Sequence, residues 1–178
     1  MSEIEKDYFF AQYKGFRSSL DSYWANYGGW KACIRSPYIT ISIFIGSLIF
    51  PGLPDHGDKC WFDIVLSVMP NILGFTLGGY AILLAFGDKE FLKLICGPDE
   101  DGSPSPFMTI NGSMVHFILV QLTSIIYALL YLSYKITEGF FAYLGFTFFI
   151  YALLTSVAAV FSIFTLAKCI DGQHSADE

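Results

Sequence analysis

Charged residues are scarce in this chain, and their scarcity decides its structural class. Only 15% of the 178 residues are charged and 54% are hydrophobic, and the hydrophobic residues stand in long blocks. This composition is too apolar for an ordinary soluble domain. The stretch from Ile64 to Ala85 carries no charge at all, and 22 helical residues are enough to cross a hydrocarbon core of about 30 Å. The sequence therefore predicts an all-α, polytopic membrane protein.

Four apolar blocks divide the chain into regions. We expect an N-terminal segment at 1–36, a four-helix transmembrane domain at 37–168 and a tail at 169–178. The four spans are expected at about 37–53, 61–86, 107–134 and 139–167. The first block is the shortest, because prolines at 51 and 54 end it after about 25 Å of helix, so it is either a short span or a re-entrant segment.

Lysine and arginine are also few, and their placement predicts the orientation. With four crossings, one side receives eight of the ten basic residues, and the other side receives only Lys59 and Lys135. Without the first crossing the split is seven to three. Because basic residues accumulate in cytoplasmic loops, the four-span arrangement with both termini in the cytoplasm is favoured. The net charge of −6 argues against direct binding to nucleic acid.

The first 36 residues contain no apolar core of the kind that a cleavable signal peptide has. They mix charges with nine aromatic residues, which favour the headgroup layer, so we expect an interfacial helix that ends at Gly28 and Gly29. The alternative is a docking surface for a soluble protein that includes Trp24 and Trp30.

The residue types that metal sites, catalysis and ion coupling require are missing or badly spaced. The four cysteines form no C-x-x-C pair, and only Cys60 has a histidine, His56, within four residues, so no metal site is expected. The span interiors contain no Asp, Glu, Lys or Arg, which disfavours a proton-coupled transporter. No nucleophile with a base, phosphate loop or glycine fingerprint is present. We therefore expect neither an enzyme nor a cofactor.

Small and polar residues follow one face of the second span at helical spacing. Such a face favours close contact with another helix, in the same chain or in a second copy. The fourth span repeats the pattern, and we expect the two spans to pack through these faces. The predicted packing or oligomer residues are Ser67, Asn71, Gly74, Gly78, Ala81, Ala152, Ser156 and Ala159. Pro70 and Asn71 indicate either a tolerated kink or a broken helix.

The third span carries the polar residues Ser113, His116, Gln121 and Ser124. Ser113, Gln121 and Ser124 share a face that is directed at the bundle centre or at an oligomer axis. His116 is the only titratable group near a span interior, and it either bonds to a neighbour or senses pH or ions. The four-residue connection from Lys135 to Glu138 makes spans three and four antiparallel neighbours.

Between spans two and three lies an acidic loop with Asp99, Glu100 and Asp101. Its spacing does not match a calcium loop, so we interpret it as a solvated surface that offers a second docking site for a partner.

The second span and its exit, from Pro70-Asn71 through Gly74 and Gly78-Gly79-Tyr80 to Phe86-Gly87-Asp88, resemble segments of small four-span proteins of anti-phage loci. In length, span number and expected cytoplasmic termini, the whole chain resembles the KwaA family, the membrane component of the Kiwa defence system. The resemblance implies a homo-oligomeric sensor in the bacterial inner membrane that holds a cytosolic DNA-binding effector, KwaB; it transfers no residue-level role. We take a tetramer as the expected oligomer. We therefore predict an oligomeric sensor or anchor for a cytosolic effector. The alternative is a subunit of an oligomeric ion channel, with a pore lined by Ser67, Asn71, Gln121 and Ser124.

Overall fold

A computed structural model describes residues 3–52, 60–85, 105–135 and 138–174, and within these ranges the ordered elements are all helical. The elements are α1 (Glu3–Tyr27), α2 (Gly29–Arg35), α3 (Pro37–Ile49), the 3₁₀ turn η1 (Phe50–Gly52), α4 (Trp61–Ala85), α6 (Pro106–Tyr134) and α7 (Gly139–His174). Segments Trp61–Ala85, Phe107–Tyr134 and Gly139–Thr165 are long and apolar enough to cross a membrane. The predicted all-α class is confirmed, and the three long apolar helices are compatible with the predicted membrane protein.

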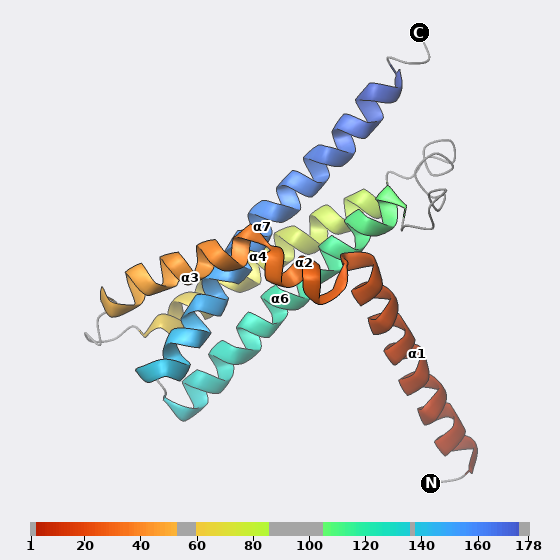
Figure 1. The fold of residues 1–178 in the computed structure, drawn as a ribbon. Helices are drawn as coiled ribbons and strands as arrows, with labels where there is room; N and C mark the ends of the chain where they lie inside the picture. The colour runs from red at the N-terminus through yellow and green to blue at the C-terminus, as the bar shows by residue number, and fades with distance from the viewer. Residues whose placement is uncertain (1–2, 53–59, 86–104, 136–137, 175–178) are drawn as a thin grey trace.

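The long helices pack side by side and alternate in direction (Figure 1). At one end of the bundle, Tyr80 of α4 bonds to Asn111 of α6. At the opposite end, Trp61 of α4 lies against Tyr131 of α6, with 5.0 Å between ring centroids. The α4 and α6 helices are therefore antiparallel.

The α6 and α7 helices form the expected antiparallel hairpin. Lys135 adopts a left-handed conformation with φ 53° at the end of α6, and Gly139 has φ 85° where α7 begins. The Tyr131 hydroxyl donates to the Phe141 carbonyl at 2.7 Å, which ties the two helices together next to this turn. The α7 helix then continues to His174, beyond the predicted end at 167.

The α3 helix runs antiparallel to α7 and lies very close to it. A Cβ atom on Gly46 would stand 2.5 Å from Thr147 Oγ1 and 3.3 Å from its Cβ, so glycine allows this approach without a shift of the Thr147 side chain. The Ser47 and Tyr143 hydroxyls bond at 2.8 Å. The α3 helix is shorter than the predicted 37–53 span because η1 begins at Phe50, before Pro51. At its other end, α3 is bent by 43° relative to α2.

The α1 helix leaves the bundle. Its last two turns contact α6, while the rest projects across the direction of the other helices toward the N-terminus (Figure 1). As predicted, the helix ends at the glycine pair, where Gly28 and Gly29 have φ values of 97° and 64°. A left-handed conformation suits glycine because it has no Cβ.

Candidate functional site

His116 joins three helices at the α1 end of the bundle. The side chain is only 5% exposed. Its Nδ1 lies 2.8 Å from the Tyr23 hydroxyl of α1, and its Nε2 lies 2.9 Å from the Tyr151 hydroxyl of α7. A neutral imidazole has one donor and one acceptor nitrogen, so one phenol donates to the ring and the other accepts from it. The histidine thus connects α1 to both α6 and α7.

Two further features of α1 and α6 hold this arrangement together. The Tyr27 ring stacks on the imidazole with 3.8 Å between centroids and 14° between planes. One turn before His116 on the same face, Gly112 lets the α1 backbone approach, because a Cβ there would lie 2.9 Å from Asn26 C and Tyr27 N. We call His116, Tyr23, Tyr27 and Tyr151 the histidine cluster.

The environment of the cluster further disfavours ionisation of the α1 phenols, which are neutral at physiological pH at their ordinary pKa. Burial raises the pKa of Tyr23 to about 12, and the neighbouring Tyr27 adds to the shift. Burial likewise raises the pKa of Tyr27. Both residues therefore retain their hydroxyl protons at physiological pH, and Tyr23 remains able to donate. Among the described residues, no group of three His, Cys, Asp or Glu side chains is placed to hold a metal ion.

The predicted polar face of α6 turns toward the bundle centre. Gln121 is fully buried and Ser124 is 3% exposed, whereas Ser113 is partly exposed. The Gln121 amide donates to Ser156 Oγ of α7 at 3.1 Å, and its Oε1 has no partner among the described residues. Inside a single chain, Gln121 therefore joins α6 to α7, and Ser124 is buried within the bundle.

The expected packing of spans two and four through their small faces is wrong for α4. Ala152 and Ala159 of α7 are buried and Ser156 is half-buried, but the α4 stripe is exposed at each of its positions: Ser67, Asn71, Gly74, Gly78 and Ala81. A Cβ on Gly74 or Gly78 would meet nothing within 4 Å.

The opposite face of α4 packs instead, through bulkier side chains that include Val65, Met69, Thr76 and Leu83. Large apolar residues of α4 such as Phe75 and Ile82 remain exposed, and lipid chains solvate apolar side chains as well as a helix interface does. The packed face is therefore selected by its fit against the other helices and not by the apolar area that it buries. The helix also continues unbroken through Pro70, which corresponds to the tolerated proline rather than to a broken helix.

The predicted docking residues are only partly within the described chain. Trp30 is 70% exposed and packs edge-on against the half-buried Trp24 at 5.0 Å between centroids. Asp99, Glu100 and Asp101 lie outside the described residues.

Sequence reasoning missed the partners of His116. The available signal was an apolar stripe on α1 with steps of four, three, four, three and four residues, formed by Phe9, Tyr13, Phe16, Leu20, Tyr23 and Tyr27. This spacing is typical of a helix that packs lengthwise on another helix. Only Tyr23 and Tyr27 do so here. The first three residues are 58–63% exposed and Leu20 is 39% exposed.

Comparisons of the chain with protein-family models, with curated proteins and with solved structures found no match.

Replacing His116 with leucine is expected to loosen α1. Both phenols would lose a partner, and each buried unpaired hydroxyl costs about 1–3 kcal/mol. Amide hydrogen exchange in residues 21–27 should accelerate while exchange in α7 near Ala152 stays slow. Tyr23→Phe, which removes only one of the two bonds, should give a smaller acceleration. Unchanged exchange in both variants would show that the histidine does not hold α1.

Proposed function

We propose that this chain is a four-span inner-membrane protein that works by association, as an oligomeric sensor or anchor for a cytosolic effector. The proposal rests on the position of α1. This helix is fixed to the bundle by the histidine cluster, yet its outer turns expose the apolar stripe and project from the other helices. A helix placed in this way provides a surface for membrane and protein contacts outside the bundle.

Four crossings are supported by the alternating directions of α3, α4, α6 and α7. Tyr38 at the start of α3 packs near Ala158 of α7, and Phe50 at its end packs near Tyr143. The bent pair of α2 and α3 has together the length and composition of one span. In this topology the α1 end is cytoplasmic, where the basic residues gather.

In the proposed arrangement α1 lies along the cytoplasmic membrane surface. Its aromatic stripe suits the headgroup layer, in which amphipathic rings accumulate. Lys14, Arg17 and Asp21 occupy the other side of the helix and are exposed, so they are available to a cytosolic partner. The resemblance to the KwaA family supplies a candidate partner, a KwaB-like DNA-binding effector.

The alternative of an ion channel has less support. Two of its four proposed lining residues, Gln121 and Ser124, are buried between helices of one chain, so water in a shared axis would not reach them. Ser67 and Asn71 are exposed on α4, but both bond to carbonyls of their own helix, those of Ile64 and Ser67.

The exposed stripe on α4 is the proposed contact between copies. Glycine and alanine allow two helices to approach closely, and Asn71 in lipid favours a polar neighbour. Gly78→Leu or Gly74→Leu should overpack this contact by about 1–3 kcal/mol and shift the oligomer toward monomer on native gels. Leu84→Ile, also on an exposed part of α4, is the control and should leave the oligomer intact. An unchanged oligomer in both glycine variants would place the contact elsewhere.

The deciding experiment changes the exposed apolar stripe of α1 and leaves the buried residues of the bundle unchanged. A variant with Phe9, Tyr13 and Phe16 replaced by serine should fold, because these side chains are exposed. Without these rings α1 no longer lies along the membrane with Lys14, Arg17 and Asp21 facing the cytosol. The variant should therefore lose a cytosolic protein that co-purifies stoichiometrically with the wild type. Phe140→Ser and Phe141→Ser, at exposed positions at the opposite end of the bundle, are the matched control and should retain it.

Reconstitution into liposomes completes the test. The wild-type oligomer should give no single-channel currents. Discrete currents that disappear in Asn71→Leu would overturn the proposal in favour of the channel. The lack of any stoichiometric partner that depends on α1 would also overturn the proposal, without favouring the channel.

A further inference from the structure

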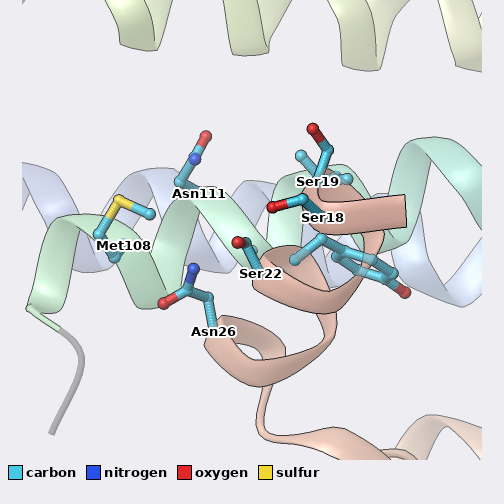
Figure 2. A pocket seen from close by; sticks show the side chains of 9 residues that line it. Ser18, Ser19, Ser22, Asn26, Met108 and Asn111 are labelled. Atoms are coloured by element: carbon cyan, nitrogen blue, oxygen red, sulfur yellow. The ribbon is translucent and has the colours of Figure 1, made fainter. Parts of the chain in front are cut away.

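A polar groove lies between α1 and α6, beside the histidine cluster. Its volume is about 360 Å³, at the lower end of the ~300–1,000 Å³ typical of small-molecule sites. Figure 2 shows the hydroxyl groups of Ser18 and Ser22 and the amide of Asn26 directed at the same space. Its polar wall comprises Ser18, Ser19, Ser22, Asn26 and Asn111.

Within the described part of the chain, most hydrogen-bonding groups of this wall have no partner. Ser19 donates to the Gly15 carbonyl at 3.1 Å. The Asn111 side-chain oxygen accepts from Tyr80 at 2.6 Å, which leaves its NH₂ group available as a donor. Hydroxyls and amides both donate and accept, so the groove can satisfy a ligand that also does both.

The rest of the lining narrows the class of ligand. None of the described residues that line the groove is charged, whereas a phosphate or carboxylate is normally held by Arg or Lys. The groove includes Met108 in the first turn of α6, but its backbone N–H already donates to Ser105 Oγ. Met108, Val115 and the Tyr23 ring provide an apolar wall. A glycerol or sugar group has both surfaces that the groove requires, with hydroxyls on one side and C–H bonds on the other.

The position of the groove adds a reason to expect such a group. Met108 to Val115 are in the first three turns of α6, and the apolar part of α6 is 28 residues long, more than the ~20 that cross the hydrocarbon. If α6 spans the membrane, as the proposed function requires, the groove lies near the level of the lipid headgroups.

We infer that the groove between α1 and α6 binds an uncharged, hydroxylated group, the glycerol or sugar of a lipid headgroup or of a free polyol. Occupation joins α1 to α6 through the ligand, and therefore stabilises the docked position of α1. This inference rests on the proposed membrane placement but not on the identity of the effector.

The test uses the full chain in nanodiscs and two matched pairs of lipids. Native mass spectrometry should show preferential retention of glucosyl diacylglycerol over diacylglycerol, or of phosphatidylglycerol over phosphatidic acid. Ser22→Leu narrows the groove and removes one hydroxyl, so retention should fall about two- to tenfold, the effect of one lost hydrogen bond. Ala25→Leu, at an exposed position of α1 that does not line the groove, should leave retention unchanged.

Free methyl glucoside and glycerol form the second arm. Competition by either compound, without preference within the lipid pairs, would assign the groove to a free polyol. No preference within either pair and no binding of either free compound would overturn the inference. Hydrogen exchange of residues 21–27 in each variant reports whether α1 stays docked. Loss of binding in Ser22→Leu with α1 docked and the effector still bound supports the site, whereas loss of the effector alone concerns only the proposed function.

Discussion

Replacing Gly112 with alanine detaches the end of α1 from the bundle. The added Cβ would lie 2.9 Å from two backbone atoms, Asn26 C and Tyr27 N, and a backbone cannot rotate out of the way as a side chain can. The helix must shift, which costs about 1–3 kcal/mol and lengthens the 2.8 Å bond between Tyr23 and His116. Amide exchange in residues 21–27 should accelerate about fivefold for a loss of about 1 kcal/mol and about thirtyfold for a loss of about 2 kcal/mol.

Gly74→Ala is the matched control for this substitution. Gly74 also lies inside a long helix, but its Cβ would meet nothing within 4 Å. Alanine is favoured over glycine in a helix interior by roughly 0.5–1 kcal/mol, so this variant should be as stable as the wild type or more so. Equal exchange of α1 in both variants would show that the close approach at Gly112 does not control docking.

Replacing Trp61 with alanine should give the largest loss of stability. Trp61 is 5% exposed and lies between Tyr131 of α6 and Gly145 of α7, where a Cβ would stand 2.6 Å from the indole ring. Truncation of a buried tryptophan costs about 3–5 kcal/mol. For a chain of this size the expected fall in Tm is about 6–20 °C, measurable by thermal unfolding in detergent.

Two further variants separate the sources of this loss. Trp61→Phe should cost less, because it keeps an aromatic ring and removes an indole N–H that has no partner among the described residues. Trp30→Ala is the control. Trp30 is 70% exposed, and surface changes usually stay within about 0.5 kcal/mol. A Tm for Trp61→Ala equal to that of Trp30→Ala would contradict the packing at this end of the bundle.

The sequence by itself determined the helical class and the three long apolar segments, because a charge-free run of more than 20 residues has few other structures available. It also determined the end of α1 at Gly28 and the hairpin between α6 and α7. A left-handed glycine and a four-residue connection impose both features locally, without help from distant residues.

Only the tertiary structure decided which face of each helix is inside. The α4 helix has two usable faces, a small one through Gly74 and a bulky one through Met69, and the fit of the bulky side chains against the neighbouring helices selected the second. The partners of His116 were likewise settled by packing, because Tyr23 is 93 residues away in the chain. Such contacts depend on where α1 crosses α6, which the close approach at Gly112 permits and no local pattern specifies.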